Sequence, residues 1–542
     1  MQKVMILGAG LMQRPAILAA RSLGLHSVVV DANPDAACVP LADSFYPVDL
    51  KDRDALLALA ERLGAGGEDG LAGVFTAGTD FSASVAHVAG HFGFPCHSFE
   101  SCLNASDKVR MRGCFAAAGV PSPFFREVGE AHVRELSAQA ERGGIEFPKV
   151  VKPCDNMGGR GCRLVRSADE LVPAVSGAVA NSRTARAILE DYMEGREFSI
   201  DSVVYNGTLT ITGFADRHIF YPPYFIEMGH TLPSLADSVV KHELFATFAL
   251  GVKALGLTCG VAKADIKYTK DGPMVGEIAA RLSGGYMSGW TFPYSSGMNV
   301  TEEAMKIAVG REPDCLLANR HPLPWRPHPS VRDREQPFAL YEIASDLVSA
   351  ERAWLSIPGK VARVCGLDGA KEIYGVRDVL PRVKAGDAVG FPRNNVEKCG
   401  NVIAVALSSE KAVSSAHEAV SSITLRLEPN NPATDAFLAG NAEPDESGFP
   451  PSAFVLSAAR NAPTLGEGSV IPADASALSC VPETLEPFVD SIEDWNHCTL
   501  RKTLEKFDAL CPRHKALDGK RFWCAALRGG IQGILYLVDS ER

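Results

Sequence analysis

The sequence predicts a multidomain protein of the α/β and α+β classes, with a doubly wound N-terminal domain and a smaller β-rich domain towards the C-terminus. Its 542 residues, 46% of them hydrophobic, can supply three or four packed cores. Strand-like and helix-like runs alternate over the first hundred residues, as in a parallel sheet covered by helices. From 336 to 428, short strands and glycine turns dominate instead.

Residues 1–105 are predicted to form a Rossmann-like, doubly wound domain. Gly8 and Gly10 follow its first strand and Asp31 ends the second, which partly matches a dinucleotide-binding fingerprint. Gln13 replaces the third glycine of that fingerprint, so NAD binding is disfavoured, and a contact between Gln13 and a small molecule stays open. The strands expected here are 3–7, 27–31 and 73–76.

Residues 106–315 are predicted to form an α+β domain. Asp107 is expected to cap a helix over 108–118 that ends at Gly119, and a further helix is expected over 299–309. A glycine-rich loop separates the first two strands of the domain. The strands expected here are 149–152, 162–165, 188–190 and 197–205.

A proline-rich segment, 322–329, predicts a linker to the next domain. Residues 330–428 combine short strands with a helix expected over 409–421, which is typical of a compact barrel-like or sandwich domain. The remaining residues, 429–542, are predicted to be a linker and an extension. Proline, asparagine and glycine are frequent from 428 to about 472, so this stretch is expected to be extended or poorly ordered.

No fold is assigned to the residues beyond 472. Cys498, Cys511, His514 and Cys524 lie there without the spacing of a zinc site, so they are expected to be ordinary core or surface residues.

The composition excludes several classes of protein. A net charge of −11 and the lack of a lysine- or arginine-rich run argue against a nucleic-acid partner. No apolar stretch reaches the roughly 20 residues of a transmembrane helix, so no membrane partner is expected. Fourteen scattered cysteines and a chain that starts directly on a strand favour a cytoplasmic protein.

A predicted hairpin near the middle of the chain carries two acids. Asp271-Gly272 is a turn signal between two strand-like runs, and folding about Asp271 places Asp265 opposite Glu277. Directly opposed residues face the same side of a sheet with Cβ atoms about 5 Å apart, so both carboxylates could share one divalent ion. The alternative is a pair of acids on the solvated face of a surface hairpin.

A glycine loop between two expected strands adds a second feature. Lys152 stands at the entrance of the loop, which contains Gly158, Gly159 and Gly161. Glycines let backbone N–H groups approach a phosphate closely, and the lysine adds positive charge. The loop is therefore predicted to be a phosphate-binding flap, with a plain hairpin loop as the alternative. Its pattern is not that of a P-loop.

The order of these features resembles the ATP-grasp superfamily over roughly residues 1 to 425. The resemblance rests on the order Lys108, Lys152 with its glycine loop, Glu190-Asp-Tyr-Met-Glu-Gly-Arg-Glu197, Asp265, Glu277 and Arg281. It is strongest to the branch with biotin carboxylase, carbamoyl-phosphate synthetase halves, purine-pathway ligases and amino-acid ligases. It implies a pre-ATP-grasp domain over 1–105 and a two-lobed ATP-grasp domain over 106–315, whose flap lobe spans about 115–190.

The resemblance also implies ATP and Mg²⁺, or Mn²⁺, as cofactors. Lys108, Lys152 and the glycine loop would hold the phosphates. Asp265 and Glu277 would hold the metal, and Arg281 would bind the substrate carboxylate and the acyl phosphate formed from it. The remaining implied nucleotide contacts are Glu190, Tyr192 and Met193 at adenine, and Glu197 at the ribose.

Two departures from the family pattern stand out. Members commonly carry asparagine two residues after the second acid, where this chain has Ala279. Asp265 also replaces a more frequent glutamate. A second metal site is therefore expected to be weakened, or completed by water or another residue.

A loop between the ATP elements resembles the substrate side of amino-acid ligases. In it, Glu227 and His230 could bind an amino group and assist proton transfer, although a structural role is as plausible for the histidine.

Residues around Lys306 mimic a biotinylation sequence, but the lysine lies in an expected helix, whereas biotinyl lysines occupy hairpin tips.

The function predicted from these features is an ADP-forming ligase that activates a small carboxylate as an acyl phosphate and transfers it to an amine. Its partners would be the small-molecule carboxylate and amine, and a homodimer is left open. The alternatives are bicarbonate activation, as in biotin carboxylase or carbamoyl-phosphate synthesis, and a non-catalytic ATP-binding module.

Overall fold

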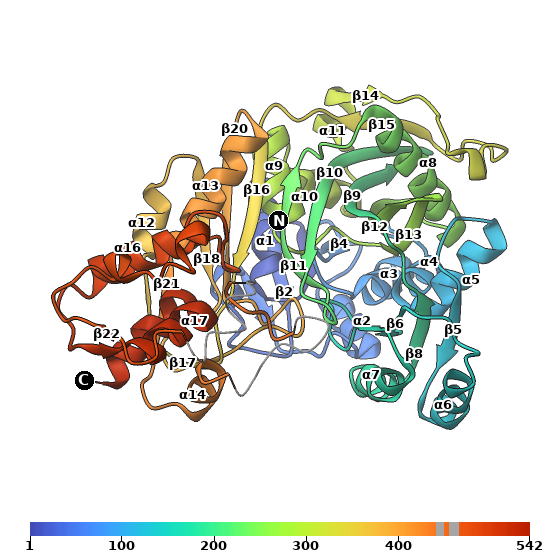
Figure 1. Cartoon of the computed structure of the whole chain (residues 1–542). Helices are drawn as coiled ribbons and strands as arrows, with labels where there is room; N and C mark the ends of the chain where they lie inside the picture. The colour runs from blue at the N-terminus through green and yellow to red at the C-terminus, as the bar shows by residue number, and fades with distance from the viewer. Residues whose placement is uncertain (441–448, 455–464, 542) are drawn as a thin grey trace. The chain divides into compact units, whose positions relative to one another are not determined.

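The computed structural model describes residues 1–440, 449–454 and 465–541, which form two compact units (Figure 1). The first unit comprises 1–218 and 230–349, and the second comprises 219–229 and 350–542. The multidomain fold class is confirmed. No helix among the described residues is long and apolar enough to cross a membrane.

The first unit begins with the predicted parallel sheet, in the order β3-β2-β1-β4. Its apolar strands are buried, and Val4, Ile6 and Val29 pack against α1 and α10. The three-residue strand β3 was not predicted, because it is short and only half buried. The strands are β1 (Lys3–Leu7), β2 (His26–Val30), β3 (Ser44–Tyr46) and β4 (Leu71–Phe75); the helices are α1 (Arg14–Ser22), α2 (Arg53–Arg62), α3 (Ser82–His91) and α4 (Phe99–Ser106).

Gln13 is a structural residue of this sheet. Its buried side chain donates a hydrogen bond to the carbonyl of Ala77 and accepts one from the Ala77 N–H, with an N···O distance of 3.1 Å. Both ends of the amide are thus used within the protein, so the contact with a small molecule considered above is not supported.

An antiparallel sheet in the order β5-β8-β6-β7 forms the flap lobe. Helices α6 and α7 bury their apolar side chains, including Leu136 and Val175, against it. Asp107 caps α5 by accepting hydrogen bonds from two backbone N–H groups, and Gly119 ends the helix at φ +65°, both as predicted. The elements are α5 (Lys108–Ala118), β5 (Phe125–Val128), α6 (Val133–Glu141), β6 (Lys149–Pro153), β7 (Arg163–Val165), α7 (Ala168–Ala180) and β8 (Ala187–Asp191).

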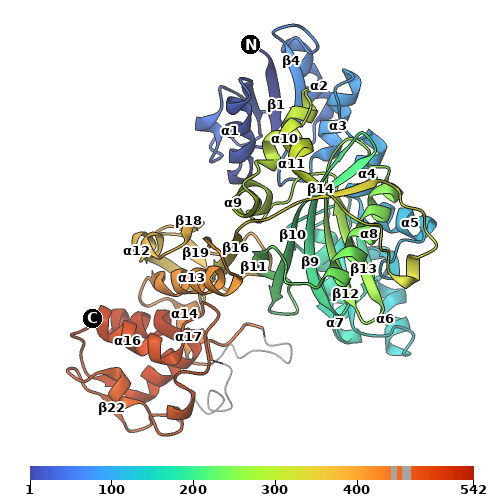
Figure 2. The same cartoon turned by 90° about the horizontal axis from the view of Figure 1, so that it is seen from above.

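A second antiparallel sheet of the first unit runs β13-β12-β9-β10, and α8 lies along it (Figure 2). Phe198, Ile266 and Phe248 belong to the apolar core between sheet and helix. The strands are β9 (Arg196–Tyr205), β10 (Thr208–Phe220), β12 (Gly260–Thr269), β13 (Gly272–Ala279), β14 (Arg320–Pro322) and β15 (Ala339–Ile343). The helices are α8 (Ser238–Leu255), α9 (Phe292–Ser296), α10 (Val300–Ala308) and α11 (Asp314–Asn319).

Lys306 lies on α10 and bonds to Glu303, so the prediction that it is a helix residue is confirmed. The proline-rich segment 322–329 starts at the end of β14, which pairs with β15. The compact units divide at 349 and 350, and the boundary at 330 stays a prediction.

The hairpin of β12 and β13 pairs Asp265 directly with Glu277, as predicted, but not by a symmetric fold about Asp271. The turn consists of two residues, Lys270 and Asp271. By itself it would pair Asp265 with Gly276 instead of Glu277. Gly276 then forms a bulge in β13 that shifts the pairing back. The bulge therefore brings the two acids opposite each other.

In the second unit, β16, β20 and β18 are neighbours in one sheet, and a three-stranded sheet has the order β19-β17-β21. Helix α13 matches its predicted range within one residue. The elements are β16 (Val348–Trp354), β17 (Gly359–Cys365), α12 (Leu367–Glu372), β18 (Val376–Pro381), β19 (Ala388–Val389), β20 (Gly400–Ala406), α13 (Ser409–Ser422) and β21 (Thr424–Leu427). Strand β11 (Ile226–Leu232) crosses the division between the units.

The C-terminal residues pack into the second unit. Apolar side chains of α16 and α17, such as Phe507 and Trp523, form one core with Leu355 of the β-rich part. The stretch predicted to be extended instead begins with helix α14, which Asn431 caps. Residues 441–448 and 455–464, also covered by that prediction, lie outside the described part. The elements are α14 (Pro432–Leu438), β22 (Val470–Ile471), α16 (Leu500–Leu510), β23 (Leu517–Asp518) and α17 (Gly519–Ser540).

Candidate functional site

The predicted acids lie on one face of the β9, β12 and β13 strands in the first unit. Asp265 pairs with Glu277 on one side and with Ser199 on the other, while Lys263 pairs with Ala279 and Asp201. Paired residues of neighbouring strands share a face of the sheet. The face therefore presents two short rows of polar side chains, one of them centred on the two acids.

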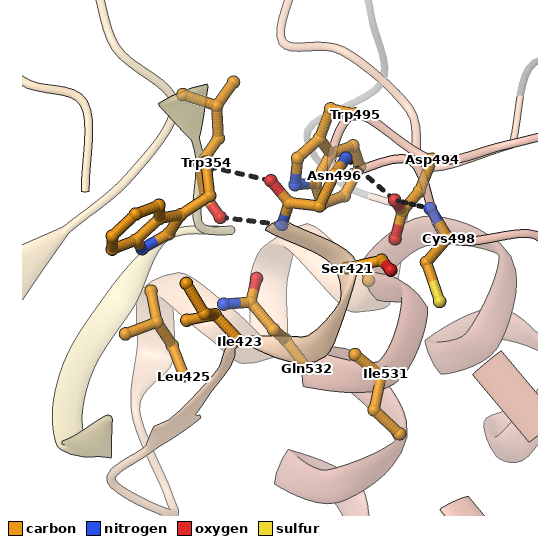
Figure 3. Close-up of a pocket in the computed structure, with 12 residues that line it drawn as sticks. Trp354, Ser421, Ile423, Leu425, Asp494, Trp495, Asn496, Cys498, Ile531 and Gln532 are labelled. Atoms are coloured by element: carbon orange, nitrogen blue, oxygen red, sulfur yellow. Dashed lines mark hydrogen bonds between the residues drawn. The ribbon is translucent and has the colours of Figure 1, made fainter. Parts of the chain in front are cut away.

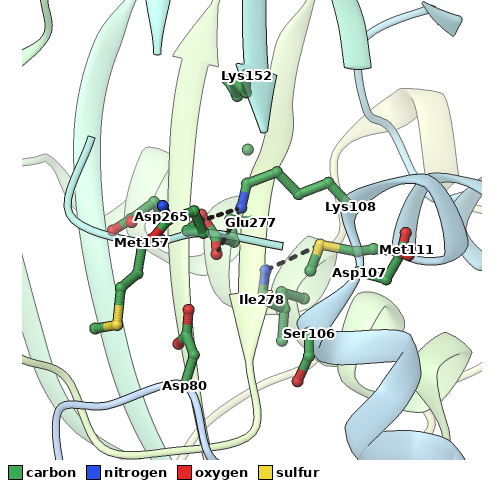
Figure 4. Close-up of polar contacts among 12 residues, drawn as sticks. Asp80, Ser106, Asp107, Lys108, Met111, Lys152, Met157, Asp265, Glu277 and Ile278 are labelled. Carbon is green, nitrogen blue, oxygen red and sulfur yellow. Dashed lines mark hydrogen bonds and ion pairs between the residues drawn. The ribbon is translucent and has the colours of Figure 1, made fainter. Parts of the chain in front are cut away.

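Cations of the protein neutralise both acids. Lys108 Nζ reaches to 3.7 Å from Glu277 Oε1, and Figure 4 shows the lysine extending from its helix towards the hairpin. Arg217 Nη1 lies 3.1 Å from Asp265 Oδ1, and the Lys263 ammonium donates to Asp265 Oδ2. The side chains of Asp265 and Glu277 are 18% and 30% exposed, so the alternative of a solvated surface hairpin is not supported.

Lys152 is held at the mouth of the glycine loop by a buried carboxylate. Its Nζ lies 2.8 Å from Glu190 Oε2, and Arg112 Nε lies 2.7 Å from Glu190 Oε1. Burial alone would raise the pKa of Glu190, but the two cations outweigh it and lower the pKa to about 2. Both oxygens of Glu190 are thus committed to cations, and the predicted contact with adenine stays a prediction.

The glycine loop has the backbone that its sequence suggested. Gly158, Gly159 and Gly161 have φ values of +70°, +75° and +68°, in the left-handed region that glycine adopts without strain. Lys108 Nζ donates to the carbonyl of Asn156 within the loop, at 2.9 Å. The loop is therefore tied to the lysine that also approaches the hairpin acids.

Three residues predicted to bind the nucleotide contact Lys267, which was not itself predicted as a site residue. Its Nζ donates to the carbonyl of Met193 at 3.1 Å and lies 3.2 Å from Glu197 Oε2. The same ammonium stands 5.1 Å from the ring centre of Tyr192. Lys267 thereby fixes three of the predicted nucleotide contacts relative to β12.

Arg281 is buried beside Asp80, an acid in the segment that follows the N-terminal parallel sheet's strand β4. Its Nε donates to Asp80 Oδ1 at 2.9 Å, and its Nη1 donates to the Leu282 carbonyl at 3.1 Å. Burial opposes ionisation of Asp80, but Arg281 and Lys108 lower its pKa below the ordinary value. Asp80 follows β4 at the carboxyl end of the parallel sheet, where ligands of such sheets commonly bind, and that signal could have identified it.

Asp201 is a second acid that the sequence analysis missed. It is fully buried, and its Oδ2 accepts a hydrogen bond of 2.6 Å from the Ser283 hydroxyl. Its Oδ1 has no hydrogen-bond partner among the described residues. Burial raises the pKa of Asp201 to about 6, despite the opposing effects of Ser283, Lys263 and Arg281.

Asp201 should make the protein less stable as the pH rises. The unfolded carboxyl ionises near pH 3.8 and the folded one near pH 6, so the folded state binds more protons between these values. Relative to Asp201→Asn, the wild-type free energy of unfolding should fall by roughly 2 kcal/mol from pH 4 to pH 7. Urea unfolding at several pH values measures this, and parallel pH profiles for both proteins would contradict it.

Glu227 and His230 lie on the same strand, β11, but Glu227 belongs to the second unit and His230 to the first. Both residues are buried. The backbone of Glu227 is held within the second unit, where its N–H donates to Asn395 Oδ1 at 2.8 Å and its carbonyl accepts from Lys398 Nζ at 2.6 Å. The roles predicted for both side chains stay predictions.

The second unit contains a small cavity lined by Trp354, Asp494 and Asn496 among others (Figure 3). The Asn496 side chain bridges the backbone N–H and carbonyl of Leu355 at 2.9 and 3.0 Å. A volume of 10 Å³ has room for about one water molecule. This cavity is therefore too small to be a substrate site.

Asp265 and Glu277 supply only part of the ligands that a divalent ion needs. Within the described residues, no group of three or more His, Cys, Asp or Glu side chains could hold a metal by itself. Two carboxylates with the remaining positions filled by phosphate oxygens and water are a common set for Mg²⁺. Asp265 and Glu277 thus suit an ion that arrives with a nucleotide.

Three family descriptions match this chain. Residues 145–289 match the ATP-grasp domain, residues 1–65 match the ribonucleotide synthetase preATP-grasp domain, and residues 353–428 match the L-amino acid ligase C-terminal domain 2.

Relatives and solved structures agree with these matches. Formate-dependent phosphoribosylglycinamide formyltransferase of Burkholderia thailandensis is 31% identical over 293 residues, which are 50% of this chain and 68% of that protein. Carnosine synthase 1 of Homo sapiens is 25% identical over 335 residues, 58% of this chain and 40% of that protein. The crystal structure of L-amino acid ligase from Bacillus licheniformis has a TM-score of 0.63 at 19% identity, covering 79% of this chain and 99% of that one.

A two-lobed fold with basic residues, a glycine loop and paired acids defines an ATP-binding enzyme of the ligase class. The chain belongs to the ATP-grasp superfamily.

Proposed function

We propose that this enzyme joins a small carboxylate, of the amino-acid class, to an amine with conversion of ATP to ADP and phosphate. The observation that carries the proposal is the convergence of Lys108 on both the glycine loop and Glu277. One ammonium then lies where the flap proposed to bind phosphates and the hairpin proposed to bind a metal meet.

The amino-acid class is supported by the domain in the second unit. Its match to the C-terminal domain 2 of L-amino acid ligases covers 353–428, outside the ATP-binding part. The likeness to L-amino acid ligase and to carnosine synthase 1 points the same way.

In the proposed reaction, a carboxylate oxygen attacks the γ-phosphorus of ATP, and the bond to the β,γ-bridging oxygen breaks to release ADP. The amine nitrogen then attacks the acyl carbon, inorganic phosphate leaves, and the nitrogen loses a proton to a base. Mg²⁺ held by Asp265 and Glu277 would neutralise the phosphate charge. Lys108 and Lys152 would bind phosphate oxygens, and the glycine loop would exclude water.

Arg281 is proposed to bind the substrate carboxylate and then the acyl phosphate. Its guanidinium is planar and always charged, so it can form two parallel hydrogen bonds to either anion. Asp80 holds one edge of the guanidinium at 2.9 Å and fixes its orientation. His230 and Glu227 are the proposed acceptors for the amine and its proton.

The experiment is a screen of phosphate release from MgATP with pairs of amino acids and other amines. One ADP and one phosphate should form for each amide, and neither should form rapidly without the carboxylate. Asp265→Asn should reduce this release at least a hundredfold, or about 3 kcal/mol in activation free energy. Undiminished release by Asp265→Asn, or ATP binding without turnover across the panel, would contradict the proposal.

A further inference from the structure

The carboxylate of Asp265 is bound by protein cations on both oxygens. Lys263 bonds to Oδ2 and Arg217 Nη1 lies 3.1 Å from Oδ1. The side chains of Lys263 and Arg217 are each only 10% exposed, so water screens their charges weakly. Glu277 has a looser partner, because Lys108 Nζ stays 3.7 Å away. Protein cations therefore bind Asp265 more closely than Glu277.

The position across the hairpin from Lys263 carries no donor for a metal. Lys263 pairs with Ala279 on β13, and its other neighbour is Asp201 on β9. Asp201 accepts from the Ser283 hydroxyl through Oδ2, while its Oδ1 has no hydrogen-bond partner among the described residues. No third acid joins Asp265 and Glu277 in a metal-binding group of the described chain. Lys263 thus lies in the row of residues next to Asp265 and Glu277, where a second ion would need ligands.

We propose that the Lys263 ammonium takes the place of a second divalent ion beside the nucleotide phosphates. This enzyme would then bind its nucleotide with one metal ion. The inference rests on the proposed function, because it concerns the complex with ATP. A divalent ion beside the ammonium would be repelled at short range, and Ala279 offers it no oxygen in compensation. A fixed ammonium stabilises the same anionic phosphates without needing ligands of its own.

Because protein cations bind Asp265 more closely than Glu277, the two acids have different roles in the proposed complex. Glu277 is the principal protein ligand of the single ion, with phosphate oxygens and water completing its shell. Asp265 contributes to that shell and also positions Lys263 and Arg217 towards the nucleotide. Arg217 reinforces this arrangement because it binds Glu197 on β9 as well as Asp265.

The test counts Mn²⁺ bound to the enzyme in the presence of an equal concentration of the β,γ-imido analogue of ATP. Electron paramagnetic resonance of free Mn²⁺ gives the stoichiometry without any turnover. The wild type should bind one Mn²⁺ per complex. The double variant Lys263→Met, Ala279→Asn, which removes the ammonium and adds an amide oxygen opposite it, should bind two.

Lys241→Met is the matched control, because Lys241 pairs with Glu342 of β15 and contacts neither hairpin acid, so it should leave the count at one. Two ions in the wild type would overturn the proposal, even if the double variant fails to fold. One ion in a folded double variant would overturn it as well. A wild type that does not bind the analogue would instead refute the proposed function, and with it the premise.

Discussion

Replacing Arg281 with alanine is expected to lower carboxylate-dependent ADP formation by roughly a thousandfold or more, the effect typical of an arginine that stabilises a transferring phosphoryl group. ATP-analogue binding should change little, because the proposed partner of Arg281 is the carboxylate. The measurement is steady-state ADP release with the best substrate pair from the phosphate-release screen.

Arg281→Ala also leaves Asp80 without its partner, so loss of activity needs a control for folding. Arg281→Lys keeps a cation beside Asp80 but loses the two-pronged geometry, and should retain only a small part of the activity. Arg332→Ala removes an arginine whose side chain is 74% exposed and should be neutral. Wild-type turnover by Arg281→Ala would exclude a role for Arg281 in the reaction.

Glu190→Gln is expected to lower the free energy of unfolding by about 3 to 5 kcal/mol at pH 7, the range for a broken buried ion pair. The substitution leaves Arg112 and Lys152 facing each other without an anion. The folded pKa of Glu190, about 2, lies below its ordinary 4.5, so its stabilisation is present above pH 4.5. The difference between wild type and variant should therefore shrink as the pH falls from 4.5 towards 2.

Urea unfolding at pH 7 and at pH 3 tests this expectation. Glu135→Gln is the matched control, because it makes the same chemical change on the flap lobe at an exposed pair with Arg126 and should have little effect. Equal losses for both variants at pH 7 would show that the buried position of Glu190 does not matter. Glu190→Gln should also weaken nucleotide binding, since Lys152 loses the carboxylate that places it.

Local patterns in the sequence predicted most of the fold. The α5 helix follows from Asp107 as its cap and Gly119 as its end, and both signals act within a few residues. The parallel N-terminal sheet follows from alternating strands and helices. Strand β3 and helix α14 were not predicted, because one is too short to show a period and the other lies in a stretch of turn-forming residues.

The candidate site was predictable where its residues are close in sequence. Asp265 and Glu277 oppose each other because a turn and alternating strands bring them together, although the bulge at Gly276 was needed for this register. Their partners Lys108 and Arg217 act from other elements, and only the fold brings them to the hairpin.

Residue types and short-range spacings were enough to predict the superfamily, the paired acids, the glycine loop and the order of the basic residues. Which charged side chains contact one another could be known only from the folded chain. Asp80 reaches Arg281 across 201 positions, and Arg112 reaches Glu190 across 78. Such contacts depend on the packing of distant elements, and the charge balance around Asp265 and Lys263 follows from that packing.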